Sequence, residues 1–451
     1  MKPYLLLTSA LLSAAVAHSF EVRQITFDNR NHDLDNNQNF SRDGEWLIYD
    51  TRNPGIGEGR TLEKVHIDTG EVRIIYSPPF IENQGPGVGA TSLSPKNDRV
   101  VFIHGPWKET GHPYDFTWRR GGLIDFDGKG PFAFADARDI TPPYTVGALR
   151  GGTHRHEWDG TGQWLGFTYN DEIMKNQGID LRTIGVTKLG QPVEVKNSDP
   201  MKYEGDGEGF SALVVHVVPN PKPGSDEVSR AASDSWVGLK GYKKEDGSMQ
   251  RARAFIGKTI SKSGEEVDEV FIVDIPEDLT QPGELGPLQG TDSAYPAPPK
   301  GASQRRLTWT EKWKTPGAIG TCWTSPDGAW ITFLAHDDEG LQQIFTISPL
   351  GGDPVQLTAI PGGVADSPRW SPDGKGLVSV AKDGRLFCLE SPGGDDPGGI
   401  REPVWLTKEK DTTTTKVVWS TQGDRIAFNR QVTNENGTAM QIFVVGAPRD
   451  F

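Results

Sequence analysis

Short apolar segments alternate with polar turns along the whole chain, and one form of this pattern returns six times. Each copy is a short polar turn followed by a strand rich in Trp or aliphatic residues. The copies read SRDGEWLIYD from Ser41, SPKNDRVVFIHG from Ser94, DGTGQWLGFTYND from Asp159, SPDGAWITFLAHD from Ser325, SPDGKGLVSVAKD from Ser371 and STQGDRIAFNR from Ser420. A strand–turn–strand repeat of about fifty residues is typical of a β-propeller.

The clearest repeat, residues 319–358, divides into four strands: GTCWTS, AWITFLA, QQIFTISP and PVQLT. The Asp-Gly pair in its first turn favours a tight reversal of the chain. The fourth strand ends in a Leu-Thr or Ile-Thr pair in several repeats, at Ile140-Thr141, Leu307-Thr308, Leu357-Thr358 and Leu406-Thr407. These pairs mark where one blade ends and the next begins.

The two ends of the chain complement each other. A further pair, Ile25-Thr26, stands near the start, whereas the last repeat ends in QIFVVG without a fourth strand. We therefore predict an all-β fold, a seven-bladed β-propeller closed by N-terminal strand exchange into the last blade, because closure removes exposed sheet edges. The predicted blades are residues 27–76, 77–141, 142–200, 201–308, 309–358, 359–407, and 408–451 together with 20–26.

The fourth repeat is irregular, so six or eight blades remain alternatives. FSALVVHVVP at 210–219, RARAFIGKTI at 251–260 and DEVFIVDIP at 268–276 read as its strands, with long polar insertions between and after them. We expect one propeller domain over residues 18–451, with this elaborated fourth blade at about 201–308, and we expect a monomer.

The N-terminus predicts secretion. Met1-Lys2, an apolar run from Tyr4 to Val16 and the small residues around Ala17 have the order of a secretory signal peptide, here residues 1–17. A membrane anchor is the alternative, but the run is short for a span. Asn436-Gly437-Thr438 is a glycosylation sequon in a predicted loop, so a glycoprotein is possible in a eukaryotic host.

The net charge of −14 disfavours nucleic acid and anionic membranes as partners. The two cysteines, Cys322 and Cys388, fall in different repeats at unlike strand positions and predict no disulfide. What remains open is a local basic pocket for a small anionic ligand.

Polar residues that suit chemistry gather in the connections that open on one mouth of a propeller's channel. They come from the first three predicted blades: His32, His104, His112, Tyr114, Arg119, Arg120, Arg150, His154, His156 and Asp171. We expect these side chains to face the same mouth.

The triplet His154-Arg155-His156 is the sharpest of these signals. Alternate residues of a strand share a face, so both imidazoles are expected to point into the channel. With His32, or with His104, they form a candidate site for a divalent metal ion. The alternative is that these histidines only line the channel and bond water and backbone.

Arginines lie beside these histidines. The forked guanidinium groups of Arg119, Arg120 and Arg150 suit a carboxylate, for example that of a uronic acid sugar. The alternative is that they are structural partners of acidic residues such as Asp171.

Several phrases resemble one known family: VFIHGP, ALRGGTHRHEW, FTYND, DLRTIGV, PGSDE and LTAIPGG. They resemble, in order and over nearly the whole mature chain, the YidR-like family of TolB-type, WD40-like propellers, described as a domain of unknown function. The repeat style and His-rich mouth are more distantly similar to oligogalacturonate lyases. That second resemblance implies a secreted or periplasmic sugar enzyme with a His-bound metal.

The leading hypothesis is a secreted carbohydrate-active enzyme, a lyase acting on saccharides that contain uronic acid. β-Elimination needs a group that neutralises the carboxylate, a base and an acid. Arg150 with Arg119 or Arg120, or a metal on His154 and His156, suits the first role, and His104, His112 or Tyr114 suits proton transfer. The alternatives are a non-catalytic propeller that binds a protein or glycan, and a small-molecule enzyme of a biosynthetic pathway.

Overall fold

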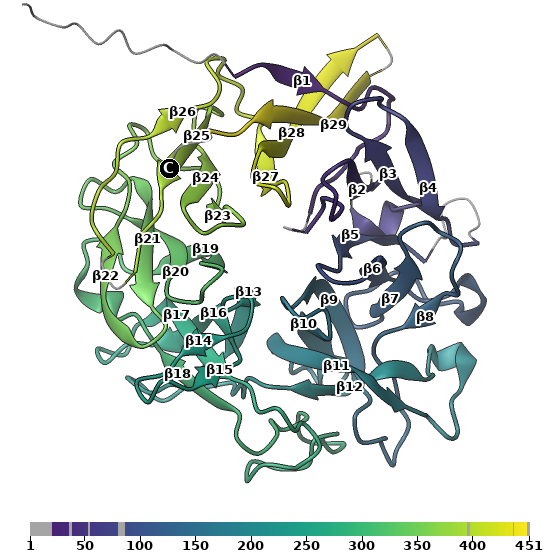
Figure 1. The fold of residues 1–451 in the computed structure, drawn as a ribbon. Helices are drawn as coiled ribbons and strands as arrows, with labels where there is room; N and C mark the ends of the chain where they lie inside the picture. The colour runs from purple at the N-terminus through teal and green to yellow at the C-terminus, as the bar shows by residue number, and fades with distance from the viewer. Residues whose placement is uncertain are drawn as a thin grey trace, which may run out of the picture.

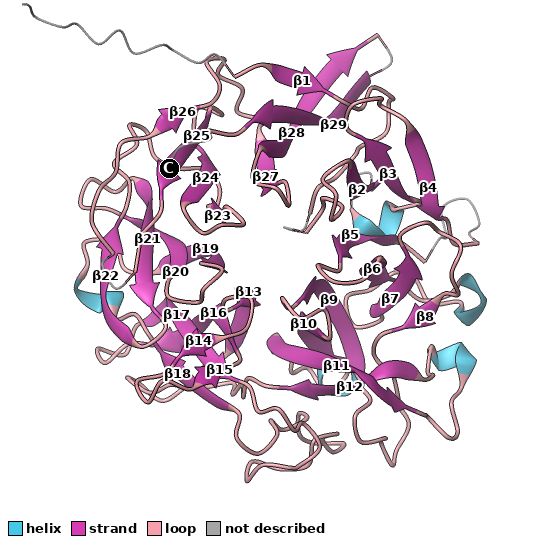
Figure 2. Ribbon diagram, viewed as in Figure 1, coloured by secondary structure: helices cyan, strands magenta, loops and turns pink. Residues whose placement is uncertain are grey.

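The computed structural model describes residues 20–35, 38–52, 55–79, 86–394, 397–435 and 437–448. Seven sheets stand around one axis, which confirms the all-β, seven-bladed propeller (Figure 1). Helix in these residues is limited to α1 (Glu172–Lys175) and a few single turns (Figure 2). No described helix is long and apolar enough to cross a membrane. The predicted signal peptide, residues 1–17, and the sequon residue Asn436 lie outside the described residues.

The sheets follow one another in chain order, and most run from an innermost to an outermost strand. The first contains β2 (Trp46–Asp50), β3 (Leu62–His66) and β4 (Val72–Tyr76); the second β5 (Val88–Leu93), β6 (Arg99–His104), β7 (Arg120–Asp125) and β8 (Ala133–Phe134); the third β9 (Gly151–Trp158), β10 (Trp164–Asp171), β11 (Thr183–Val193) and β12 (Gly207–Leu213); the fourth β13 (Arg230–Trp236), β16 (Ala252–Ile260), β17 (Glu266–Asp274) and β18 (Ser303–Arg306).

The remaining three sheets repeat this order. The fifth contains β19 (Ala318–Thr324), β20 (Ile331–His336), β21 (Gln342–Ser348) and β22 (Gly351–Gln356); the sixth β23 (Arg369–Trp370), β24 (Gly376–Val380), β25 (Leu386–Glu390) and β26 (Val404–Trp405); the seventh β27 (Thr415–Trp419), β28 (Arg425–Asn434), β29 (Gly437–Gly446) and β1 (Val22–Gln24). The hairpin β14 (Tyr242–Lys243) and β15 (Met249–Gln250) is inserted in the fourth blade.

The fourth blade corrects the strand assignment made from sequence. Residues 210–213, the start of the strand predicted at 210–219, belong to β12, which pairs with β11 of the third blade. The innermost strand of the fourth blade is β13, which carries no apolar run and so escaped prediction. The boundary was misplaced because this blade lacks the repeated turn phrase.

The repeated turn is held by its own serine. In the fifth blade, the Ser325 hydroxyl donates to Asp327 at 2.6 Å and accepts from the Trp330 amide at 3.0 Å. Gly328 has φ +76°, a conformation that glycine adopts without strain. The same contacts recur around Ser371 in the sixth blade. The phrase therefore specifies the turn locally, in each blade by itself.

The Leu-Thr and Ile-Thr pairs also have a local physical role. In four blades the threonine hydroxyl of the outermost segment accepts a backbone N–H of the neighbouring strand. The pairs are Thr26 with Ile442, Thr308 with Val270, Thr358 with Ile344 and Thr407 with Leu386, at 2.8 to 2.9 Å. The apolar residue before each threonine is buried. Thr26 does for the seventh blade what an internal threonine does for the others.

The apolar core lies between adjacent blades. Phe210 and Trp164 of the third blade share one buried cluster with Phe255 and Phe271 of the fourth. Phe333 and Phe345 of the fifth blade pack in a second cluster with residues of the fourth. Each blade therefore depends on both neighbours for burial, and a ring satisfies this requirement for every blade.

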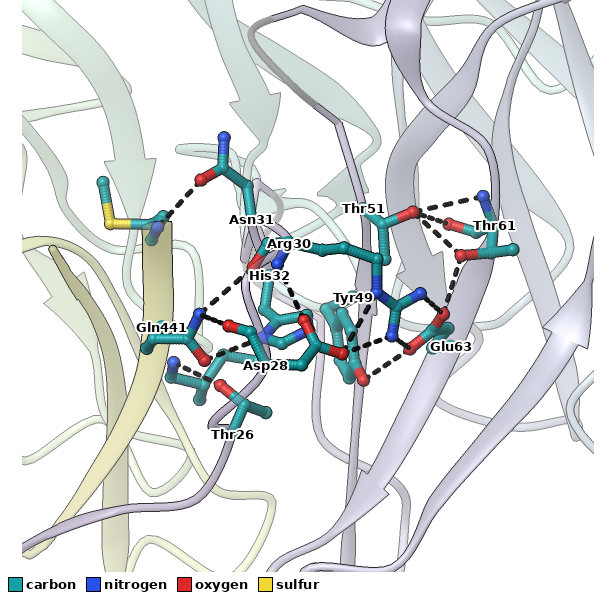
Figure 3. Close-up of polar contacts among 12 residues, drawn as sticks. Thr26, Asp28, Arg30, Asn31, His32, Tyr49, Thr51, Thr61, Glu63 and Gln441 are labelled. Atoms are coloured by element: carbon teal, nitrogen blue, oxygen red, sulfur yellow. Dashed lines mark hydrogen bonds and ion pairs between the residues drawn. The ribbon is translucent and has the colours of Figure 1, made fainter. Parts of the chain in front are cut away.

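The first and last strands of the described chain share the seventh sheet, where β1 runs antiparallel to β29 and pairs Val22 with Val445. The segment that follows β1 then crosses to the first blade through a polar network (Figure 3). Arg30 bonds both Asp28 and Glu63 at 2.5 Å, and the Gln441 side chain of β29 donates to the carbonyls of Asp28 and Arg30. The network joins three segments that are distant in sequence.

A β-bulge recurs in the innermost strands of five blades, and in each the bulged residue has a positive φ. These residues are Ala90, Arg155, Ser233, Gly320 and Lys416, with φ between 54° and 76°. A bulge places two residues opposite one and changes the direction of the side chains that follow. It therefore decides which side chains of the innermost strands reach the channel.

We expect Thr26→Val to lower the free energy of unfolding by roughly 1 to 3 kcal/mol, because the Ile442 N–H loses its acceptor. Thr407→Val is the matched control, since it removes the same bond inside the sixth blade. Denaturant unfolding should show similar losses, and amide exchange of residues 22–24 should rise only in Thr26→Val. An unchanged stability of Thr26→Val beside a destabilised Thr407→Val would show that the N-terminal segment does not help to close the ring.

Asp28 should make this junction sensitive to acid. Burial opposes its charge, but hydrogen bonds from His32 and Arg30 outweigh burial and hold the Asp28 pKa well below its usual range. A lowered pKa contributes stability that is present above the ordinary value, about 3.8, and is lost as the pH falls below it. We expect Asp28→Asn to be less stable than wild type at pH 7 and to lose less on acidification, as measured by melting temperature against pH. Parallel profiles would contradict this.

Candidate functional site

A cavity of about 660 Å³ opens at one mouth of the channel, between the second, third and fourth blades. Its volume lies within the range of small-molecule sites. Four arginines and one histidine line it: Arg119, Arg155, Arg182, Arg230 and His154. The acidic residues in its wall, Asp180 and Asp234, are engaged: Asp180 accepts from Asn170 at 2.8 Å, and Asp234 pairs with Arg253 at 2.5 Å. We call this the mouth cavity.

Arg182 carries a partly buried charge, and its hydrogen bonds go only to neutral groups. Its guanidinium donates to the Asn170 side chain at 3.1 Å and to the Thr168 hydroxyl. Burial, and then the positive charge of Arg119, lower the Arg182 pKa to about 10. Within the described part of the chain, neither Arg182 nor Arg119 forms an ion pair, and the Arg119 Nε is buried without a hydrogen-bond acceptor. Two guanidinium groups without an ion pair therefore line the same cavity, close enough for the charge of Arg119 to lower the Arg182 pKa.

His154 lies between these charges. It belongs to β9 and pairs with Thr168 of β10 just before the bulge. Burial, followed by Arg119 and Arg182, lowers its pKa well below the usual value, so the imidazole is neutral at pH 7. Its Nδ1 is buried without a hydrogen-bond partner among the described residues. A neutral imidazole beside two guanidinium groups can accept a proton from a bound anion.

Arg155 owes its position to the bulge. Its φ of +56° is strained for a residue with a side chain, at a cost of about 1 to 3 kcal/mol. The guanidinium lies 5.0 Å from the Trp323 ring and donates to the Thr321 hydroxyl at 3.3 Å. The strain places a third positive group in the mouth cavity.

The same bulge separates the two histidines that regular alternation would have brought together. His156 does not line the mouth cavity, and its Nε2 lies 2.9 Å from the Thr153 hydroxyl. Burial lowers the His156 pKa to about 3. His32 is also elsewhere, between Gln441 at 3.0 Å and Asp28 at 3.2 Å, as Figure 3 shows.

The three candidate metal ligands are therefore not gathered. The described residues contain no group of three or more His, Cys, Asp or Glu side chains placed to hold a metal ion. The physical reason is the bulge at Arg155, together with the role of His32 at the junction of the first and last blades. We derive no chemical step through a metal.

His104 and Arg120 are neighbours in the second blade but lie in its interior. His104 is fully buried among aromatic rings, with its Nδ1 2.9 Å from the Tyr203 hydroxyl, and burial lowers its pKa to about 3. Arg120 donates to the carbonyls of Asp136 and Asp206 at 2.6 Å. These contacts give both residues a structural role.

Arg150 and Asp171 form a buried ion pair at 3.0 Å. Arg150 also donates to the carbonyls of Thr291 and Ala294, at 2.6 and 3.0 Å. The pair thereby fastens the long insertion that follows β17 to the third blade. Its side chain has no exposed surface, so a ligand in the mouth cavity does not reach it.

His112 and Tyr114 lie on the loop that also carries Arg119. His112 is exposed and stacks on Trp118, with ring centroids 3.7 Å apart. Tyr114 lies under Arg119, whose guanidinium carbon is 5.2 Å from the ring. Of the residues singled out in the sequence, only Arg119 and His154 reach the mouth cavity.

Sequence reasoning missed Arg155, Arg182 and Arg230 as site residues. Arg182 follows the α1 turn in DLRTIGV, and Arg230 begins β13, the strand that was not predicted. The only sequence signal for these residues was an arginine in a connection on the same face as Arg119. That signal does not distinguish them from other arginines of the chain. Arg155 was not predicted as a site residue because the direction of its side chain depends on the bulge.

The fold and this cavity together define a β-propeller with an arginine-rich cavity at one mouth of its channel. A family profile described as "Protein of unknown function (DUF3748)" matches residues 87–203. The uncharacterized protein YidR of Escherichia coli K12 is 41% identical over 385 residues, which cover 83% of this chain and 88% of that protein. The chain belongs to the YidR family of propellers.

Two solved structures show the same fold. An oligogalacturonate lyase in complex with manganese has a TM-score of 0.56 at 12% identity, over 96% of this chain and 95% of that one. An oligogalacturonate lyase from Vibrio parahaemolyticus has a TM-score of 0.53 at 10% identity, over 96% and 98%. At these identities the similarity establishes the arrangement of blades.

The contrast between the buried Arg150 and the partly buried Arg182 can be measured. Arg150→Lys should lower the free energy of unfolding by about 3 kcal/mol, because lysine cannot keep both Asp171 and the two carbonyls. Arg182→Lys should cost less than about 1 kcal/mol, since it removes bonds to neutral groups only. Denaturant unfolding of both variants tests this assignment, and the reverse order of losses would contradict it.

Proposed function

We propose that the mouth cavity binds a uronate unit of an acidic saccharide and that the protein is a lyase that cleaves the chain there by β-elimination. The observation that carries this proposal is the adjacency of the unpaired Arg119 and Arg182 to the neutral His154. A carboxylate placed on the two guanidinium groups would supply the missing negative charge.

The same arrangement supplies what the elimination needs. The proton to be removed lies on the carbon that carries the carboxylate, and positive charge on that carboxylate stabilises the carbanion. His154 lines the cavity, and its neutral imidazole can accept the proton. The electron pair of that bond then forms the new carbon–carbon double bond, and the bond to the glycosidic oxygen breaks. The leaving oxygen takes a proton from the imidazolium or from water, so no co-reactant is consumed.

Two further observations support a saccharide as the ligand. The wall offers hydroxyl and amide groups beside the arginines, from Ser233, Thr168 and Asn170. Both solved structures named above are oligogalacturonate lyases. The N-terminal sequence, with its signal-like order, supports a secreted or periplasmic setting where such saccharides are met.

Turnover should depend on His154 and on Arg182 in different ways. The assay follows the ultraviolet absorbance of the unsaturated product over a panel of uronate oligosaccharides. His154→Gln should lower kcat by roughly 10² to 10⁴, because proton transfer is lost, with little change in binding. Arg182→Lys should instead weaken binding, because a point charge does not replace a planar fork.

His112→Gln is the matched control, since His112 is exposed and outside the cavity; its kcat should equal that of wild type. Saccharide binding that requires Arg182, without an unsaturated product from any panel member, would overturn the lyase and favour a glycan-binding propeller. No binding of any acidic saccharide would overturn the proposal as a whole.

The pH profile gives an independent test. Because the His154 pKa is lowered, its neutral form persists below pH 6.5, and kcat/KM should stay constant as the pH falls to that value. The decline of kcat/KM on the acidic side, the acidic limb of the profile, should begin only below pH 6.5. Arg182→Gln removes a positive neighbour, so the His154 pKa should rise and the limb of the residual activity should move to higher pH. A limb at or above pH 6.5 in wild type, or a shift to lower pH in the variant, would contradict the role of His154.

A further inference from the structure

A second cavity, of about 420 Å³, lies at the opposite end of the channel, where the innermost strands end and the repeated turns begin. The proposed elimination does not use it. Its wall is aromatic because the innermost strand of five blades carries, in its last or next-to-last position, a tryptophan that lines the cavity: Trp158, Trp236, Trp323, Trp370 and Trp419. We call this the tryptophan cavity.

Most of the polar atoms around this cavity are already used inside the blades. The indole N–H groups of Trp158, Trp236, Trp370 and Trp419 donate to protein oxygens at 3.0 to 3.3 Å. The hydroxyls of Ser325 and Ser371 donate to Asp327 and Asp373 of their own turns. The cavity therefore offers a ligand mainly ring surface.

Arg369 is the polar exception. Its guanidinium lies 3.5 Å from the Trp323 ring, and its Nε donates to the Val417 carbonyl at 3.3 Å. The Nη1 is buried without a hydrogen-bond partner, and in the described part of the molecule Arg369 forms no ion pair. Burial, and then the charge of Arg155, lower the Arg369 pKa to about 9. The aromatic wall thus contains a positive charge that, among the described residues, forms no ion pair.

The acidic residue in the wall does not neutralise Arg369. Glu157 lies 3.1 Å from Arg253, and Arg253 also pairs with Asp234. The Trp236 amide donates to the same Glu157 oxygen at 3.3 Å. A negative group on the ligand is what would complete this cavity.

We propose that the tryptophan cavity is a second binding site, for a small aromatic carboxylate whose ring lies among the tryptophans and whose carboxylate bonds Arg369. Aromatic rings pack favourably against one another, and a guanidinium–carboxylate bond is among the stronger hydrogen bonds in proteins. Trp323 stands between the two cavities, with Arg369 of the tryptophan cavity 3.5 Å from its ring and Arg155 of the mouth cavity 5.0 Å from it. The site is independent of the proposed elimination.

The test uses the full mature chain and three probes: 3-phenylpropionate, its neutral amide 3-phenylpropanamide, and propionate, which has the charge without the ring. Binding is measured by calorimetry and by tryptophan fluorescence. We expect 3-phenylpropionate to bind and to change the fluorescence, and the other two to bind at least about tenfold more weakly, because each lacks one half of the recognition.

Arg369→Met keeps an unbranched apolar side chain but removes the guanidinium and its charge, and it should bind acid and amide equally. Arg42→Met is the control, because Arg42 is at the rim and already pairs with Asp98 at 2.8 Å; it should bind as wild type does. Equal affinity of wild type for acid and amide would overturn the proposal, as would unchanged preference in Arg369→Met. Absence of binding at millimolar concentrations would do the same, whether or not the protein cleaves uronates.

Discussion

The bulge in the innermost strands is the constraint on which the rest of the structure depends. A regular strand would send alternate side chains into the channel, but the bulged residue takes a positive φ and interrupts that alternation. At Arg155 this interruption keeps His154 in the mouth cavity and sends His156 into the blade. Ser233 lines the same cavity from the corresponding bulge of the fourth blade. The cost of the strained backbone is borne where the ligand is expected to bind.

The architecture could be predicted because its signals are local. The serine that bonds within its own turn, around Ser325 and Ser371, and the threonine that bonds the next strand each act within one blade, so they leave a repeat in the sequence. The fourth blade lacks the turn phrase, and there the prediction of β12 and β13 failed. The blades with the repeated turn phrase could be predicted from sequence, whereas the strand pairing of the blade without this phrase could not.

The site was predicted only in part, because it depends on the direction in which each side chain points and on partners that are distant in sequence. Arg119 and His154 were found from their place in the connections. Arg150 satisfied the same criterion, yet its guanidinium is taken by Asp171 and by carbonyls of an insertion some 140 residues further along the chain. Nothing near Arg150 in the sequence distinguishes these outcomes. Which arginine is left without a partner is a property of the packed molecule.

Unpaired guanidinium groups are the common feature of both ends of the channel. On a chain with a net charge of −14, carboxylates are abundant, yet Arg119 and Arg182 at one end and Arg369 at the other have none among the described residues. Burying a charge without a partner is destabilising, and such groups are often retained for a ligand. At the first end, the neutral His154 adds a group that can accept a proton, and at the second end the tryptophans add an aromatic wall.

The central claim is that the mouth cavity recognises the carboxylate of its ligand. The most direct measurement is calorimetric affinity for a uronate oligosaccharide and for the same oligosaccharide with its carboxylates methyl-esterified, at one pH and one salt concentration. The structure predicts that esterification weakens binding by at least about tenfold in wild type, because a charge-assisted bond is lost, and by much less in Arg182→Gln. Equal affinity of wild type for the acid and the ester would contradict the account.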